Sequence, residues 1–200
     1  MPSITAIKPQ KTKNRVNVYL DNKFGFGLDL ETFVISQIKV GNVYSNDEIN
    51  NLINEGQYRN TINRLIAFCT MRPRSEKEIY DWLQRKKVPS ESHEKVFDKL
   101  KSLELLNDLN FANWWIDQRE SFRPRSKRQL EFELHNKGIS KQVIDEIFSK
   151  KMPDDVSHAS RLIAQRDYKW RNLGKLEAKK KKTEYLARKG FSWETIKKVV

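Results

Sequence analysis

Four arginines in this sequence occur in two copies of one short motif, where they could bind phosphate or carboxylate groups. Arg72-Pro73-Arg74-Ser75 recurs as Arg123-Pro124-Arg125-Ser126, 51 positions later. In each copy a proline ends one helical pattern and a serine is placed to cap the next helix. Free backbone N–H groups and the helix dipole attract anions there, and a guanidinium can hold an anion through two hydrogen bonds. Alternatively, the arginines pair with acidic neighbours on the next repeat and serve packing, and the sequence leaves both roles open.

A second group of basic residues lies near the C-terminus. Lys179-Lys180-Lys181-Lys182 forms a run on a predicted helix that also carries Lys175, Arg188 and Lys189. Such a run is usually a solvated face, and its functional interpretation is non-specific contact with phosphates. The third copy of the repeat carries Lys175-Leu176-Glu177-Ala178 where the first two carry the arginine motif. We therefore predict a filament- or DNA-binding surface from all these residues: Arg72, Arg74, Arg123, Arg125, Lys127, Arg128, Lys175, Lys179, Lys180, Lys181, Lys182, Arg188 and Lys189.

The charge distribution also favours a polyanionic partner. The formal net charge is +13, yet residues 1–55 hold six basic and six acidic residues. The excess therefore lies wholly in residues 56–200, and residues 154–200 alone contribute 13 basic against 6 acidic residues. A fold needs no such excess, whereas binding to a nucleic acid or an anionic surface does. A basic protein that is merely soluble is the alternative.

The sequence offers little that would support catalysis. Its three histidines are scattered without a cluster of metal-ligand spacing, and no phosphate-binding glycine loop or nucleophile motif occurs. We expect no enzymatic activity, no cofactor and no metal. Trp114-Trp115 could stack on bases, but one core tryptophan with a half-buried partner is the favoured interpretation. Cys69 follows Ile62, Leu65 and Ile66 on one helical face and is predicted to be a core residue.

The motif spacing divides the chain into repeats. The breaks Lys86-Lys87-Val88, Lys137-Gly138-Ile139 and Lys189-Gly190-Phe191 follow one another at intervals of 51 and 52 positions. A shared period of this length indicates one supersecondary unit used three times. We predict a mainly α protein with three tandem three-helix repeats (residues 56–104, 105–152 and 153–200) in an elongated, curved array, after an α+β module over residues 1–55.

Local chemistry predicts several details. Alternating residues in 3–28 indicate strands, with a two-residue hairpin turn at Asp21-Asn22 and with Phe24, Phe26 and Leu28 on one face. Ser45 and Glu48 form a capping box that opens a helix, and the first repeat begins near Gln57. Ser75 with Glu78, and Ser126 with Gln129, have the same box spacing. Gly138 and Gly190 stand where a left-handed C-terminal cap is expected.

Three segments of the sequence resemble the RecX family. They are Arg72–Glu78, the run Leu105–Ala112 followed by Trp115, and Arg123–Ser126 with Leu130, Glu133, Leu134 and Lys137-Gly138-Ile139. The ending Tyr185–Ser192 is also similar to that family's closing segment. The likeness covers about residues 57–200, and the N-terminal strands match the family's variable N-terminal part more weakly.

The resemblance implies a bacterial regulator of the RecA recombinase in DNA repair, homologous recombination and the SOS response. Such proteins bind the RecA–single-stranded-DNA filament and inhibit filament growth, ATP hydrolysis and strand exchange. Expected partners are the RecA filament and single- and double-stranded DNA. We expect a cytoplasmic monomer without a membrane partner, because there is one cysteine, no signal segment and no long apolar run. The alternatives are a general nucleic-acid-binding helical repeat protein without a RecA partner and, more distantly, a nuclease.

Overall fold

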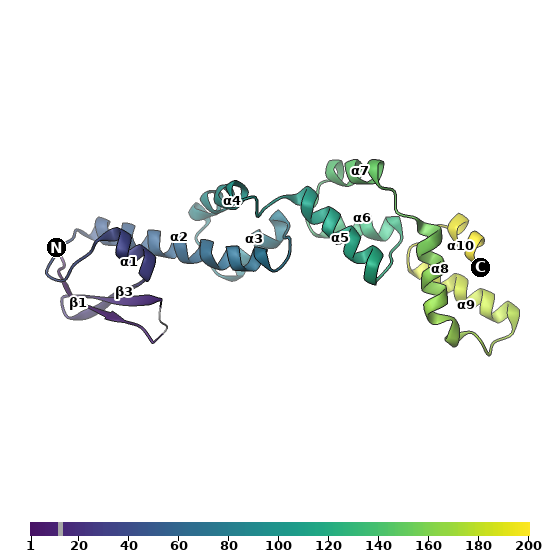
Figure 1. The fold of residues 1–200 in the computed structure, drawn as a ribbon, viewed down its shortest axis with the longest axis horizontal. Helices are drawn as coiled ribbons and strands as arrows, with labels where there is room; N and C mark the ends of the chain where they lie inside the picture. Colours follow the sequence, from purple (N-terminus) through teal and green to yellow (C-terminus); the bar gives the residue numbers. More distant parts are fainter. Residues whose placement is uncertain (12–13) are drawn as a thin grey trace. The chain divides into compact units, whose positions relative to one another are not determined.

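The fold is described from a computed structural model, in which residues 1–11 and 14–200 are defined (Figure 1). As predicted, the chain is mainly helical, and a small sheet is confined to its N-terminal part. The chain divides into two compact units. Residues 1–71 and 85–103 form the first, and residues 72–84 and 104–200 form the second.

A three-stranded antiparallel sheet begins the first unit. Its strands are β1 (Ile4–Pro9), β2 (Arg15–Leu20) and β3 (Lys23–Asp29), in spatial order β1-β2-β3. The predicted hairpin at Asp21-Asn22 is confirmed. Both residues have positive φ, 48° and 64°, which is the conformation that a type I′ turn requires.

The predicted common face of Phe24, Phe26 and Leu28 is wrong for Phe24. Tyr19 pairs with Phe24 while Val18 pairs with Phe26, so Gly25 is an extra residue in β3. This β-bulge moves Phe24 to the opposite face, where its ring meets the edge of Tyr19 and is 61% exposed. Phe26 and Leu28 remain buried in the core.

The first unit also contains α1 (Leu30–Ser36), α2 (Asn46–Thr70), the 3-10 turn η1 (Ser90–Ser92) and α4 (His93–Ser102). The predicted capping box opens α2, because Ser45 and Glu48 each accept a hydrogen bond from the other's backbone N–H. The helix then runs for 25 residues without a break, through the position near Gln57 where the first repeat was expected to begin. Its first half contributes Ile49 to the core of the sheet, and its second half carries the buried Cys69. One helix therefore serves both the N-terminal module and the first repeat.

The second unit begins with α3 (Glu76–Arg85), whose residues up to Gln84 belong to it, and continues with two groups of three helices. The first group is α5 (Asp108–Phe122), α6 (Lys127–Asn136) and α7 (Lys141–Lys150). The second is α8 (Asp155–Arg166), α9 (Lys175–Arg188) and α10 (Trp193–Val199), with the 3-10 turn η2 (Asp167–Lys169) after α8. These groups correspond to the predicted second and third repeats.

Each group of three helices encloses its own hydrophobic core. Phe111, Ile116, Leu130 and Leu134 lie in the core of the second repeat, together with Ile144. The core of the third repeat contains Ala159, Leu162, Trp170, Tyr185, Leu186, Phe191 and Ile196. No helix in the described part of the chain is long and apolar enough to cross a membrane.

The predicted left-handed caps at Gly138 and Gly190 are confirmed, with φ of 84° and 81°. Lys87 occupies the equivalent position of the first repeat with φ of 53°, so the turn itself tolerates a side chain. Close approach explains the glycines. A Cβ on Gly138 would lie 2.6 Å from the Lys77 Cβ, and one on Gly190 would lie 2.9 Å from the Ser126 Oγ.

Gly138→Ala therefore combines left-handed strain with a steric clash, and we expect it to lower the free energy of unfolding by about 2–4 kcal/mol. Gly41 is the matched control, because its φ is 92° and a Cβ there would meet nothing within 4 Å. Gly41→Ala should cost about 1–2 kcal/mol, from strain alone. Urea unfolding of both variants measures the difference, and equal losses would contradict the role given to close approach.

Candidate nucleic-acid interface

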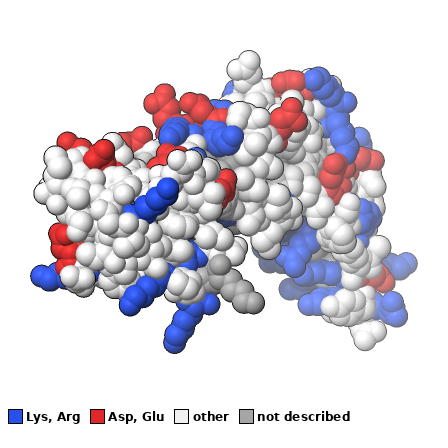
Figure 2. Space-filling view, turned by 60° about the vertical axis from the view of Figure 1, so that its left-hand side comes forward, with Lys and Arg blue, Asp and Glu red and all other residues white. Residues whose placement is uncertain are grey.

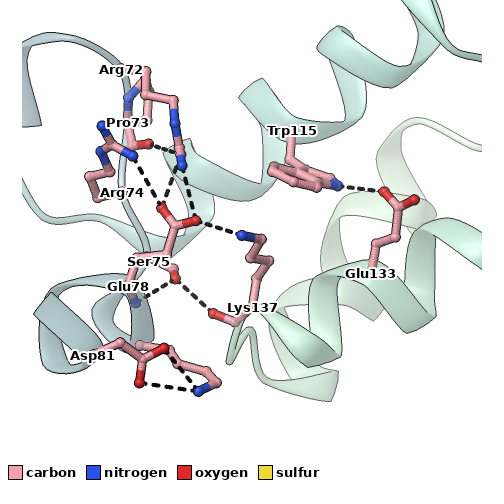
Figure 3. Close-up of polar contacts among 10 residues, drawn as sticks. Arg72, Pro73, Arg74, Ser75, Glu78, Asp81, Trp115, Glu133 and Lys137 are labelled. Atoms are coloured by element: carbon pink, nitrogen blue, oxygen red, sulfur yellow. Dashed lines mark hydrogen bonds and ion pairs between the residues drawn. The ribbon is translucent and has the colours of Figure 1, made fainter. Parts of the chain in front are cut away.

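Ser75 connects the first Arg-Pro-Arg-Ser turn to the second repeat. Its Oγ accepts a hydrogen bond from the Glu78 N–H (3.2 Å), as the predicted cap of α3, and donates one to the Lys137 carbonyl (2.7 Å) at the end of α6. The adjacent N–H of Glu76 donates to the Asp108 carboxylate at the start of α5 (2.9 Å). Ser75 is completely buried, so its hydroxyl needs both partners. We call this contact, of residues 72–78 with Lys137 and Gly138, the first joint (Figure 3).

The second Arg-Pro-Arg-Ser turn makes the same contact with the third repeat. Ser126 accepts from the Gln129 N–H (3.2 Å) and donates to the Lys189 carbonyl (3.0 Å), and the Lys127 N–H donates to the Asp155 carboxylate (2.8 Å). The buried His158 adds a bond from its Nδ1 to the Arg125 carbonyl (3.1 Å). Residues 123–129 with Lys189 and Gly190 form the second joint. The repeated motif is thus a device that fixes one repeat to the next.

A single carboxylate is shared by three cations in the first joint. Arg72 lies with its two terminal nitrogens 3.0 and 2.9 Å from the two carboxylate oxygens of Glu78. Lys137 donates to Oε1 from 2.7 Å, and Arg74 stands 3.9 Å from Oε2. Glu78 therefore does not close the predicted capping box with Ser75, because cations on both sides take its oxygens (Figure 3). Arg74 is only 9% exposed.

Glu78 is held in its charged form by these neighbours. Burial acts to raise its pKa, but hydrogen bonds from Arg72 and Lys137 and their positive charges outweigh burial and lower the pKa. The same balance lowers the pKa of Glu133 in the second repeat. That carboxylate accepts hydrogen bonds from Arg119 (2.6 Å), Trp115 (2.9 Å) and Arg125 (3.2 Å).

The second joint lacks the equivalent of Glu78. Gln129 stands at that position of the motif, and its Cβ faces Gly190. Lys189, the equivalent of Lys137, forms no ion pair with any residue among 1–11 and 14–200. Burial and the nearby charges of Arg125, Arg166 and Arg188 lower its pKa. Positive charge therefore collects at the second joint, whereas in the first joint Glu78 offsets part of the charge of its cations.

The lysines of α9 point mainly to solvent. Lys175, Lys179, Lys180 and Lys181 are exposed, and none forms an ion pair within the described chain. Lys182 differs, since it lies 3.4 Å from Asp167 and over the ring of Trp170. Figure 2 shows Lys and Arg side chains gathered at the lower right of that view with few acidic ones among them.

The structure thus sorts the predicted binding residues into two classes. The side chains that form an ion pair within the chain are those of Arg72, Arg74, Arg125, Lys127 and Lys182. Those without an ion pair to a described residue are Arg123, Arg128, Lys175, Lys179, Lys180, Lys181, Arg188 and Lys189. For Arg72, Arg74 and Arg125 the contacts favour a packing role, but their carboxylate partners lie in the same repeat and not in the next one, as that alternative expected. Binding by the second class remains a prediction.

Sequence reasoning missed Arg166, which lies 4.7 Å from the centre of the Tyr185 ring, the same ring that Lys189 of the second joint contacts. It also missed Arg161, which donates to the carbonyls of Glu120 and Ser121 and so ties α8 to the end of α5. A signal for Arg166 existed, because Asp108 and Arg119 are spaced as Asp155 and Arg166 are. Comparing the repeats position by position would have found it.

The tryptophan pair is engaged within the protein. Trp114 and Trp115 are both partly buried against the core of the second repeat, whereas the sequence favoured one fully buried member. The Arg119 guanidinium lies 4.4 Å from the Trp115 ring centre and the Lys137 ammonium 4.9 Å from it. These contacts favour packing over base stacking. Within residues 1–11 and 14–200, no cluster of His, Cys, Asp or Glu is arranged to hold a metal ion.

Four models of one family match successive parts of this chain. They are described as the RecX N-terminal domain (residues 2–45) and the first, second and third RecX three-helix domains (residues 62–100, 107–147 and 154–200). The matches span the sheet and all three helical repeats, including the weaker third repeat.

Curated relatives and solved structures agree with these matches. The chain is 31% identical to the regulatory protein RecX of Clostridium acetobutylicum, over 99% of this chain and 94% of that protein. It is 30% identical to the regulatory protein RecX of Bacillus pumilus, over 100% of this chain and 77% of that protein. A crystal structure of regulatory protein RecX has a similar fold, with a TM-score of 0.70, 22% identity and coverage of 100% and 98% of the two chains. RecX from Lactobacillus salivarius matches with a TM-score of 0.60 and 19% identity, over 71% of this chain and 93% of that one.

Glu78→Gln should destabilise the first joint, because Arg72, Arg74 and Lys137 lose their shared carboxylate. We expect a loss of about 1–3 kcal/mol at pH 7. Since the folded-state pKa of Glu78 lies below its ordinary value of 4.5, its contribution is present above that value and is lost as pH falls through the folded pKa. The difference in melting temperature between wild type and variant should therefore shrink as the pH falls below 4.5.

Glu91→Gln is the control for this change. Glu91 is exposed in η1 and forms no ion pair with a described residue, so its loss should leave the melting temperature unchanged at every pH. A pH-independent effect of Glu78→Gln would show that the carboxylate charge is not what stabilises the joint.

Proposed function

Because the chain belongs to the RecX family, we propose that it binds the RecA–single-stranded-DNA filament and inhibits filament growth, ATP hydrolysis and strand exchange. It would act in the cytoplasm, as a monomer, during DNA repair and recombination. The observation that carries the proposal is the family match over nearly the whole chain, since the family's role is to regulate RecA.

The arrangement of the second unit supports binding as the mode of action. The two joints fix α3 and two successive three-helix repeats to one another through buried hydrogen bonds. A body fixed in this way can present basic side chains at set intervals, which suits a regular polymer better than a single small ligand. We propose that it acts by binding alone, without turnover of its own.

The direct test is DNA-dependent ATP hydrolysis by RecA. Purified protein should lower the rate at substoichiometric amounts relative to RecA, because each bound molecule would affect a whole filament. An unchanged rate over a range of ratios would rule the proposal out.

A general nucleic-acid-binding protein is the second candidate, and the exposed lysines of α9 favour it. It would bind DNA tightly and with steep salt dependence in the absence of RecA, with no preference for the filament. Binding to filament and to bare strand, compared at several salt concentrations, separates the two candidates.

The two arginines of the second motif should differ when each is replaced. Arg123→Ala removes an exposed side chain and should weaken filament binding several-fold with less than about 0.5 kcal/mol change in stability. Arg125→Ala removes a partner of Glu133 that is 22% exposed and should cost about 1–3 kcal/mol of stability. ATPase inhibition and thermal melting of both variants check this. A marked loss of stability in Arg123→Ala would assign that side chain to packing as well.

A further inference from the structure

The two joints share a backbone arrangement but differ in charge. Both have the serine bond to a lysine carbonyl, and Lys137 and Lys189 have the same backbone angles, φ −85° and ψ 1°. Equivalent positions can therefore be compared directly. In the first joint Glu78 pairs with Lys137, whereas in the second the neutral Gln129 stands at the position of Glu78, with its Cβ near Gly190.

A second carboxylate, that of Glu133 in the second repeat, has no counterpart in the third repeat. Glu133 and Tyr185 are equivalent, since each stands four residues before the lysine of its turn. In the second repeat, Glu133 neutralises Arg119. In the third repeat, the equivalent cation Arg166 lies over the Tyr185 ring at 4.7 Å, and the Lys189 ammonium lies 5.8 Å from the same ring centre.

Arg119 and Lys137 in the second repeat each pair with a carboxylate, but their equivalents in the third repeat, Arg166 and Lys189, do not. Neither Arg166 nor Lys189 forms an ion pair with a residue that the structure describes, and Arg188 adds a charge where the second repeat has Asn136. The backbone N–H groups at the start of α6 are already bound by Ser126 and Asp155, so an incoming anion would meet side chains. Positive charge gathers around the half-buried Lys189, because Arg166 and Arg188 stand exposed near it, and this favours binding of an anion that replaces the missing carboxylates.

We propose that the second joint binds a backbone phosphate of a single DNA strand through Lys189, Arg166 and Arg188. This site rests on the proposed function and adds to it the place at which the protein would hold the strand within the filament. The phosphate takes the place that the Glu78 carboxylate has in the first joint.

Two observations favour a nucleic-acid strand over an acidic protein surface. Helix α9 carries exposed lysines at 175 and 179–181 over about 10 Å of the helix before it reaches Arg188, which suits an extended polyanion. Phe122, beside Arg123 in the same turn, is 73% exposed, and an exposed aromatic next to basic residues is typical of platforms for unpaired bases.

Gln129→Glu tests the site, because it places a carboxylate at the position that Glu78 has in the first joint. We expect it to weaken binding to fluorescent oligo-dT several-fold at low salt. The slope of log K against log salt should become shallower by about 0.7 for the loss of one phosphate contact. The melting temperature should stay the same or rise, since Lys189 gains a partner. Arg188→Gln, at an exposed position, should produce the same loss of affinity.

Gln142→Glu is the matched control, since it makes the same charge change at an exposed position of α7. Equal oligo-dT affinity and slope for wild type, Gln129→Glu and Gln142→Glu would overturn the site, as would wild type that fails to bind oligo-dT. Loss of filament binding by Gln129→Glu with unchanged oligo-dT binding would assign the joint to an acidic protein surface instead. Because the oligo-dT measurement contains no RecA, its outcome is separate from that of the ATPase test.

Discussion

The second unit depends on one hydrogen bond made twice, from a buried serine hydroxyl to a lysine carbonyl in the next repeat. A helix C-terminus leaves carbonyls without partners, and a helix N-terminus leaves N–H groups without partners. Ser75 and Ser126 satisfy one group of each kind, since each hydroxyl accepts from its own helix and donates to the following repeat. Without this pairing, polar groups at both helix ends would be buried unsatisfied.

Each such contact joins the serine of one repeat to the glycine turn of the next. This explains why not every repeat has both the serine and the glycine. The first repeat has the serine, but its turn carries Lys87, because in the described chain no Arg-Pro-Arg-Ser turn precedes it. The second repeat has both the serine and Gly138. The third has Gly190, whereas α9 begins at Lys175 and its N-cap, Gly174, offers no side chain for a hydrogen bond.

Much of the fold was predictable because its signals are local. The type I′ turn at Asp21-Asn22, the serine caps and the glycine caps each follow from a few adjacent residues. The bulge at Gly25 was not predictable, since it depends on the register between β2 and β3. The same holds for the partners of Glu78, because Lys137 lies 59 positions away and no pattern in either segment indicates the other. The four arginines of the two motifs lie at turns, as predicted. Whether each faces an external partner or a carboxylate of this chain depends on contacts between residues that are distant in the sequence.

The difference between the joints follows from the cost of burying charge. A cation loses hydration when it is partly buried, and a carboxylate within hydrogen-bond reach restores the loss. In the first joint the Glu78 carboxylate provides this compensation, so Arg72 and Lys137 help to hold the two repeats together. The second joint has the same serine bond, the His158 bond and the bond from the Lys127 N–H to the Asp155 carboxylate, but no ion pair of Lys189 with a described residue. The cations around Tyr185 keep their contacts with its ring but have no carboxylate like Glu133 beside them. The two copies of one contact thus differ in charge through two side-chain replacements, of Glu78 by Gln129 and of Glu133 by Tyr185.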